Sequence, residues 1–252
     1  MDWKMIDIHT HILPGLDDGS ATMAQSLEMA AMAAESGTDI LAATPHTNQK
    51  GRFENYACAA IDQRLMQLKK KIYERGIRIH VFPGMEIMAS DDLGRLMDAG
   101  MVHGINFGPY YLVEFPFDAS RTWIEARLED IRIRRAIPLI AHPERYFVVQ
   151  DYPELLYHWL ASGCRLQLNR GSILGRFGDR VEKTAKYMLK YDLVTCIGSD
   201  AHSHKMRTPY MRDVRDDVKR RMGKDKAWRY FYANPERILS GQPIAMHGIE
   251  AR

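Results

Sequence analysis

The feature that most constrains the fold of this chain is a regular alternation of short apolar segments with helical segments. The apolar segments have the length and composition of buried strands, and they cover residues 5–12, 39–43, 77–82, 110–113, 137–141, 164–168 and 193–197. Helical patterns follow at residues 21–36, 56–75, 91–99, 122–135, 153–162, 179–190, 209–222 and 226–232, the first with Ser20 as the expected N-cap. This order predicts one α/β domain over residues 1–252, with a parallel sheet and right-handed crossovers.

Polar residues stand at the carboxyl ends of six of the seven expected strands. They are His9 and His11, His46, Glu86, Glu114, His142, and Asp200 with His202. In a β/α barrel these ends gather around one pocket, whereas the crevice of a doubly wound open sheet draws on fewer strands. The pattern therefore favours a distorted, TIM-like (β/α)7 barrel.

The first strand carries a two-histidine pattern. Alternation along a strand puts His9 and His11 on the same face, opposite Ile6 and Ile8. A turn containing Asp17 and Asp18 follows, and either carboxylate could return toward the imidazoles. Taken alone, this segment is equally consistent with a half-buried strand whose histidines are hydrogen-bonded. Because similar residues recur at six strand ends, a metal centre is the better interpretation.

Five imidazoles and four carboxylates are too many ligands for one ion and suit two or three. The set is His9, His11, Asp18, His46, Glu86, Glu114, His142, Asp200 and His202. It contains no cysteine, so manganese, iron and zinc are all chemically reasonable. Arg145 and Arg207 follow two of these ligands closely and could bind phosphate oxygens, and Arg170 is a weaker candidate.

Composition excludes several other classes of protein. The net charge of +3 is too small to indicate nucleic-acid binding, and the basic runs lie in helical patterns. No stretch reaches the roughly 18 uninterrupted apolar residues of a membrane helix. Cys58, Cys164 and Cys196 are few and widely spaced, which points to the cytoplasm rather than to a disulfide framework. Whether the protein forms an oligomer stays open.

The motifs together resemble those of the PHP (polymerase and histidinol phosphatase) superfamily. They are His9-Thr-His11, Thr44-Pro-His46, Gly84-Met-Glu86, Leu112-Val-Glu114-Phe-Pro116, Ala141-His-Pro-Glu-Arg145 and Gly198-Ser-Asp-Ala-His202. The turn Asp17-Asp-Gly-Ser20 and the ending Asn234-Pro-Glu-Arg-Ile-Leu-Ser-Gly241 are similar to the CpsB/CapC-type bacterial protein-tyrosine phosphatases.

The resemblance implies a seven-stranded barrel that holds three metal ions, usually manganese. It implies one ion on His9, His11, Glu86 and Asp200, a second on Glu86, Glu114 and His142, and a third on Asp18, His46 and His202. Arg145 and Arg207 match the arginines that contact phosphate in this branch. The implied substrate is a phosphotyrosine protein, namely a bacterial tyrosine autokinase that controls capsule or exopolysaccharide assembly.

Other readings stay open at this point. The same barrel could serve a histidinol-phosphate phosphatase, a nuclease, an amidohydrolase or a non-catalytic regulatory module. His204 could act as a general acid or be a surface histidine. The Cys-x5-Arg spacing of cysteine-dependent phosphatases occurs at Cys58 and Cys164, but neither segment has the glycine-containing loop that a phosphate cradle needs.

Overall fold

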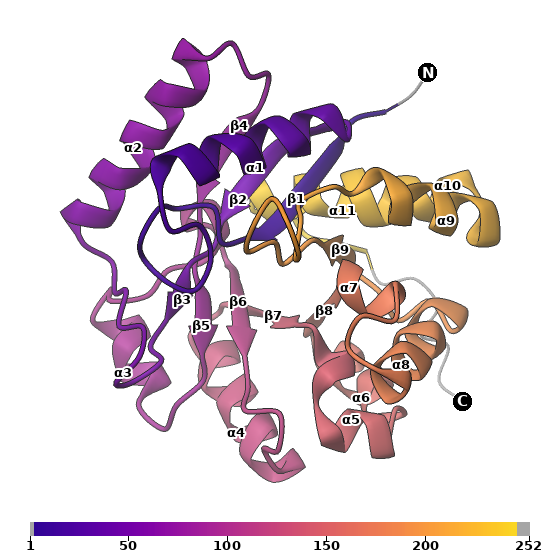
Figure 1. Ribbon diagram of the computed structural model, residues 1–252. Coiled ribbons are helices and arrows are strands. Elements are labelled where there is room, and N and C mark those ends of the chain that lie inside the picture. Colours follow the sequence, from indigo (N-terminus) through magenta and orange to yellow (C-terminus); the bar gives the residue numbers. More distant parts are fainter. Residues whose placement is uncertain (1–2, 246–252) are drawn as a thin grey trace.

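The computed structural model describes residues 3–245, and its strands are all parallel. One sheet contains β1 (Met5–Thr10), β2 (Thr38–Ala43) and β4 (His80–Pro83). The other contains β3 (His46–Thr47), β5 (Glu86–Met88), β6 (Tyr110–Glu114), β7 (Ile137–Ala141), β8 (Arg165–Asn169) and β9 (Cys196–Gly198). Helices surround the strands (Figure 1), so the predicted α/β barrel is confirmed.

Two of the seven expected barrel strands are broken in the middle, which distorts the barrel. The second runs as β2 and then β3, and the third as β4 and then β5, each passing from one sheet to the other. Pro45 lies in the first break and cannot donate a ladder hydrogen bond. At the second break, a Cβ on Gly84 would lie 2.9 Å from the side chains of Thr44 and Ile105, so a larger residue would require both side chains to move. The strands restart with His46 paired to Glu86, which brings two candidate ligands side by side.

The ring of strands closes between β1 and the end of β9. The amide of Asp200 donates to the His9 carbonyl, and the amide of His11 donates to the Ala201 carbonyl, both at 2.9 Å. The pairing of β1 with β2 shifts register between Asp7 and Thr10. Such a bulge redirects the side chains that follow it. It explains how Ile6 and Ile8 pack in the barrel interior while His9 and His11 also face inward, so the simple alternation predicted for this strand was wrong.

The helices follow the predicted order with shifted ends and additional short elements. They are α1 (Met23–Glu35), α2 (Ala59–Glu74), α3 (Leu93–Asp98), α4 (Arg121–Arg132), α5 (Phe147–Asp151), α6 (Leu155–Ala161), α7 (Arg170–Ile173), α8 (Asp179–Lys190), α9 (Arg212–Met222), α10 (Lys224–Trp228) and α11 (Asn234–Leu239). Short 3-10 or π turns are η1 (Ile105–Phe107), η2 (Pro143–Arg145) and η3 (Arg229–Ala233). The N-cap of α1 is Thr22, whose hydroxyl accepts from the Gln25 amide, so the expected cap at Ser20 was wrong.

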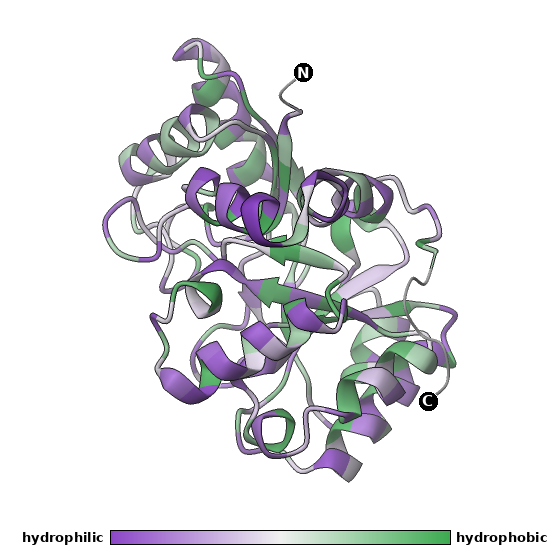
Figure 2. Cartoon of the chain, turned by 90° about the vertical axis from the view of Figure 1, so that its right-hand side faces the viewer, coloured by the Kyte–Doolittle hydropathy of each residue, from purple (hydrophilic) through white to green (hydrophobic). Residues whose placement is uncertain are grey.

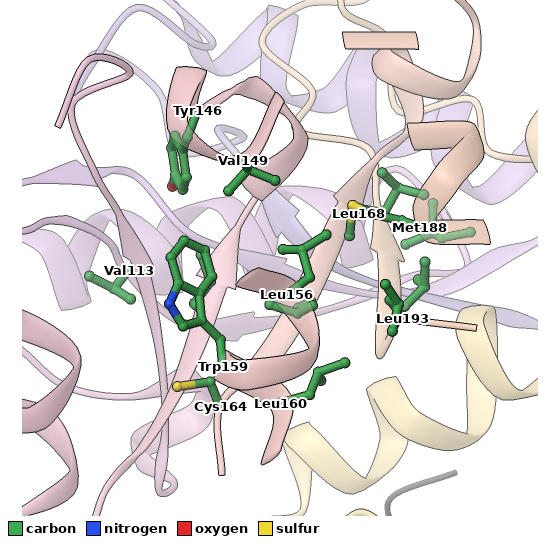
Figure 3. Packing of buried hydrophobic residues seen from close by; sticks show 14 of the residues in the cluster. Val113, Tyr146, Val149, Leu156, Trp159, Leu160, Cys164, Leu168, Met188 and Leu193 are labelled. Carbon is green, nitrogen blue, oxygen red and sulfur yellow. The ribbon is translucent and has the colours of Figure 1, made fainter. Parts of the chain in front are cut away.

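Helical periodicity explains which helix faces are buried. In α4, Ile124, Leu128 and Ile131 recur at intervals of four and three, and all three are buried. They join a large core between the outside of the second sheet and its helices, part of which Figure 3 shows around Trp159 and Tyr146. Figure 2 shows hydrophobic, green stretches in the central strands, whereas the helices carry both green and purple residues. This outer core holds the strands in the register that brings their ends together.

The amino end of the barrel is filled by apolar side chains and closed by α11. Ile238 and Leu239 of this helix pack with Tyr110 and Cys196 inside the barrel. The Tyr110 hydroxyl donates to the Gln242 carbonyl at 2.7 Å, which ties the segment after α11 to β6. The candidate site therefore lies at the other, carboxyl end. Among residues 3–245, no helix is both long and apolar enough to cross a membrane.

Candidate metal centre

The structure brings all nine predicted metal ligands together at the carboxyl end of the barrel. Ligand atoms of eight of these residues form three overlapping groups, each with all atoms within 4.8 Å of one another. The groups are His9, His11, Glu86 and Asp200; His46, Glu86 and Glu114; and His11, Asp18, His46 and His202. His142 lies beside the second group, with Nε2 at 2.9 Å from Glu86 and 3.6 Å from Glu114.

The first group is fully enclosed and has the spacing of ligands around one ion. Asp200 Oδ1 lies 3.5 Å from His9 Nε2 and 3.4 Å from His11 Nε2. Glu86 lies 3.2 Å from each of the same two nitrogens. Atoms that share an ion at about 2.1 Å are roughly 3.0–3.5 Å apart. The four side chains therefore fit a single divalent cation.

The third group lies nearer to the solvent. Asp18 Oδ1 lies 3.4 Å from Nε2 of both His46 and His202, and the Asp18 side chain is 39% exposed. Asp17 points elsewhere: its carboxylate accepts from His11 Nδ1 at 2.7 Å and from the His46 amide at 2.9 Å. Of the two neighbouring aspartates, Asp18 thus belongs to the third group of candidate ligands, whereas Asp17 contacts His11 and His46 from outside that group.

The turn that carries both aspartates depends on glycine. A Cβ on Gly19 would lie 2.3 Å from the His11 carbonyl oxygen, so no larger residue fits without moving the turn. The Gly19 amide also donates to Asp17 at 2.9 Å. The sequence Asp17-Asp-Gly-Ser20 therefore holds one carboxylate against His11 and leaves the next one free to face the pocket.

The electrostatics of the site suit a cation. Burial would lower the pKa of His9, but the carboxylates of Glu86 and Asp200 outweigh that effect and raise the pKa to about 9. Burial and the charge of Glu86 raise the pKa of Glu114. The clustered carboxylates thus favour protons on their neighbours, and a divalent ion would replace those protons.

Other side chains of the site are held neutral. Burial lowers the pKa of His142 and of His202 to about 4 in each case. Neutral imidazoles are the form that binds metals. Among the described residues, Glu86 Oε2, Asp200 Oδ1 and His202 Nε2 are buried atoms without a hydrogen-bond partner. Such unpaired buried polar atoms are costly, and metal coordination would satisfy them.

Two candidate ligands at this end of the barrel have a strained backbone conformation. His142 and Asp200 both have left-handed backbone conformations, with φ of 32° and 51°. Residues other than glycine rarely adopt left-handed conformations, and such conformations cluster at functional sites. His142 directly follows β7 and Asp200 follows β9 after one residue, where the turn aims each side chain back over the barrel.

Two arginines reach the pocket beside these ligands. Arg145 Nη1 lies 3.7 Å from Asp200 Oδ2, and Arg207 pairs with the same oxygen. The Arg145 guanidinium packs against the rings of Phe117 and Phe177, each at 4.5 Å from the ring centroid. Both arginines line a cavity of about 270 Å³, whose lining also includes Asp18, His46, Glu86, Glu114 and His142.

The sixth expected strand, β8, for which no ligand was predicted, supplies groups that contact the candidate ligands. Gln167 Oε1 lies 2.9 Å from His9 Nδ1, and Asn169 Nδ2 donates to Asp200 at 2.5 Å. Outer groups of this kind fix the ring and carboxylate orientations of metal ligands. Arg52, which the sequence reading also missed, donates to Asp18 at 3.2 Å from the rim of the cavity.

Four weaker candidates lie away from the groups of candidate metal ligands. Arg170 is buried and paired with Asp213 rather than with a ligand. His204 lies 3.2 Å from Glu28. Cys58 precedes α2 on the surface and Cys164 is buried, so neither sits in a phosphate-binding loop.

Comparison with known proteins now adds the family. A family model described as capsular polysaccharide synthesis, CpsB/CapC, matches residues 5–240. The chain belongs to this family. It is 34% identical over 240 residues to the tyrosine-protein phosphatase YwqE of Bacillus subtilis (strain 168), covering 95% of this chain and 93% of that protein.

Solved structures agree with the family assignment. One from a study of YwqE from Bacillus subtilis and CpsB from Streptococcus pneumoniae, described as unique metal-dependent tyrosine phosphatases, superposes with a TM-score of 0.89 at 33% identity and covers 96% of each chain. A histidinol phosphate phosphatase from Lactococcus lactis shares the fold, with a TM-score of 0.56 at 15% identity, over 87% of this chain and 94% of that one.

Proposed function

We propose that this CpsB/CapC family protein is a metal-dependent protein-tyrosine phosphatase. The observation that carries the proposal is the convergence of two arginines on Asp200, at the rim of three groups of buried metal ligands. One arginine guanidinium can donate two parallel hydrogen bonds to two phosphate oxygens. An amide or lactone substrate would not need such arginines. The named relatives are tyrosine phosphatases, which supports the same substrate class.

Each side chain has a role in this proposal. His9, His11, Glu86 and Asp200 would hold one ion, Glu86, Glu114 and His142 a second, and Asp18, His46 and His202 a third. Oxygen and nitrogen ligands without sulfur suit manganese, and they also suit iron or zinc. When bound, the ions supply an acidified water and a clamp for phosphate oxygens.

The chain's own residues orient the phosphate. Phe117 and Phe177 restrict the Arg145 guanidinium, so that less side-chain freedom is lost when it binds the phosphate. Arg207 approaches Asp200 from the turn that follows β9. The two arginines would neutralise the equatorial oxygens while the tyrosine oxygen leaves. A phenol has a pKa of about 10, so this leaving group depends less on a general acid than an alkyl oxygen does.

The physiological substrate in this proposal is a tyrosine kinase of capsular or exopolysaccharide assembly. The family description, capsular polysaccharide synthesis, supports this choice. Three free cysteines, two of them buried, are consistent with a protein that works in the cytoplasm.

The deciding experiment measures phosphate release by protein loaded with manganese, iron or zinc. A phosphotyrosine peptide, a phosphoserine peptide and histidinol phosphate serve as substrates, and metal content is measured in parallel. We expect preference for phosphotyrosine and loss of activity in Asp200→Ala. His158→Ala, on an exposed histidine of α6, is the matched control and should behave like the wild type. Failure of every metal-loaded form to hydrolyse phosphotyrosine would refute the proposal.

A further inference from the structure

A second cavity, of about 540 Å³, adjoins the metal centre. We call it the basic groove; it is lined by Asn169, Arg170, Gly171, Arg176, Phe177, Ser199, Lys205, Met206 and Arg207. It lies between the segment that follows α7 and the turn that follows β9. Four of these lining residues are cationic, and none of these nine described residues is acidic. Its charge therefore favours an anionic occupant.

Not all of the groove's cations are equally available. Arg170 is buried, and its charge is offset by Asp213, with Nε at 3.0 Å from Oδ1. Arg176 is exposed and uses Nη1 to donate to the Met206 carbonyl at 2.7 Å, which leaves further N–H donors of the guanidinium. Lys205 is exposed on the facing turn. Arg176 and Lys205 are therefore the cations that a ligand could reach.

The groove is already shaped. The Ser203 hydroxyl accepts from the amides of Lys205 and Met206, at 3.3 and 3.1 Å. The Arg207 carbonyl accepts from the His202 amide at 2.8 Å, which closes the base of the same turn. Together with the bond from Arg176, these contacts hold the backbone of the turn that carries Lys205, so binding would require little rearrangement of that backbone.

The basic groove is continuous with the catalytic pocket. Arg207 lines both cavities, and the Phe177 ring contacts the guanidinium of Arg145 at 4.5 Å and that of Arg207 at 6.0 Å. A phosphate held by the two arginines would thus be separated from the basic groove by the Phe177 ring. Met206, 79% exposed, adds an apolar surface against which a peptide could lie.

We propose that the basic groove binds an acidic side chain of the substrate next to the phosphotyrosine. The inference rests on the proposed function, because it needs a phosphotyrosine peptide in the catalytic pocket. Successive residues of an extended peptide are about 3.3 Å apart, which is short enough for a neighbouring side chain to enter an adjoining cavity. Exposed ion pairs are individually weak, so two of them would give a preference of roughly three- to tenfold.

The test compares three phosphotyrosine peptides that carry glutamate, glutamine or lysine on both sides of the phosphotyrosine. For the wild type we expect kcat/KM to be roughly three- to tenfold higher for the glutamate peptide than for the glutamine peptide, mainly through KM. The double variant Arg176→Gln/Lys205→Gln should lose this difference. Lys183→Gln, on an exposed lysine of α8 outside the groove, should retain it.

A charge reversal guards against a variant that is merely misfolded. Lys205→Glu should gain activity on the lysine peptide relative to the glutamate peptide, which a damaged protein would not do. Equal kcat/KM for the glutamate and glutamine peptides in the wild type would overturn the proposal, as would a preference that persists in the double variant. Hydrolysis of all three peptides at equal rates would refute only the groove. Hydrolysis of none would refute the proposed function itself.

Discussion

The interior of the barrel is apolar at the amino ends of its strands and charged at their carboxyl ends. At the amino end, Tyr110, Cys196 and Ile238 fill the interior with apolar surface. At the carboxyl end, Glu86 and Asp200 are as deeply buried but carry charge. The first arrangement stabilises the fold on its own, whereas the second costs free energy until cations bind. Stability and function are therefore separated along the barrel axis, and substitutions at the two ends should have different effects.

The largest effect should come from removing a ligand at the carboxyl end. His9→Ala or Asp200→Ala should lower kcat/KM by at least about a thousandfold, because the ions supply several kcal/mol of transition-state stabilisation. Metal removal with a chelator should do the same to the wild type, and manganese should restore only the wild type. Circular dichroism should show a folded barrel in each variant. An unfolded Asp200→Ala protein would contradict the separation of the two ends.

The reverse pattern is expected at the amino end. Ile238→Ala removes buried methyl groups from a side chain with no exposed surface and should lower the free energy of unfolding by about 3 kcal/mol. Activity per folded molecule should not change, because α11 lies at the far end from the ligands. Denaturant unfolding and steady-state kinetics on the same preparation check both statements. A large fall in kcat would show that the two ends are coupled.

Arg145 tests how phosphate binding depends on geometry. Arg145→Ala should lower kcat about a hundredfold, because the loss of one hydrogen-bond donor to the transition state has an effect of about this size in other enzymes. Arg145→Lys keeps the charge but loses the planar fork that packs on Phe117 and Phe177, so it should restore only part of the activity. Arg180→Ala, at an exposed ion pair with Asp151, is the control. Full activity of Arg145→Lys would show that phosphate binding does not depend on the planar guanidinium.

The orienting groups should affect metal affinity more than the fold. Gln167→Leu removes the partner of His9 Nδ1, and Asp17→Asn replaces the charged partner of His11 Nδ1 by a neutral amide; each should weaken metal binding by about 10- to 100-fold. Titration calorimetry with manganese measures this directly. Activity should recover at high metal concentration, which distinguishes orientation from catalysis. Unchanged affinity would remove these residues from the metal centre.

The smallest effect concerns an ionised group at the amino end. Burial would raise the pKa of Asp192, but the Tyr230 hydroxyl and the Arg229 guanidinium outweigh this and lower it below its ordinary value of 3.8. A lowered folded-state pKa stabilises the protein above pH 3.8, and that contribution disappears as the pH falls through the folded value. Asp192→Asn should therefore cost about 1 kcal/mol of stability at pH 7 and less at strongly acidic pH. Unfolding curves at several pH values would show this convergence, and a constant difference would contradict it.

The sequence was sufficient to predict the barrel and to choose nine candidate ligand residues that the structure brings together. Strand ends can be read locally, because apolar runs and the polar residues that follow them are adjacent in the chain. The orienting contacts could not be read in this way. Gln167 reaches His9 across 158 positions, and glutamine in a strand carries no signal of its own. Asn169 did stand at a predicted strand end, and the absence of a ligand there was a sign that this strand supports its neighbours.

Some local geometry also depended on contacts between distant segments. The bulge in β1 arises where that strand pairs with β2, so alternation alone assigned the facing of Ile6 and Ile8 incorrectly. The breaks at Pro45 and Gly84 were visible as residue types, but their effect, a strand that restarts in a second sheet, depends on the approach of Thr44 to Gly84. The choice between Asp17 and Asp18 likewise needed the fold, because both are carboxylates in one turn.

That turn has a consequence for how the ions load. Asp17 is hydrogen-bonded to His11, which belongs to two of the candidate ligand groups. The next residue in the chain, Asp18, belongs to the outer group. An ion that bound Asp18 would further restrain the turn that carries Asp17, and with it the His11 imidazole that the inner group contributes. Metal uptake should therefore be cooperative, with a sigmoidal dependence of activity on manganese concentration that becomes hyperbolic when Asp17→Asn uncouples the two aspartates.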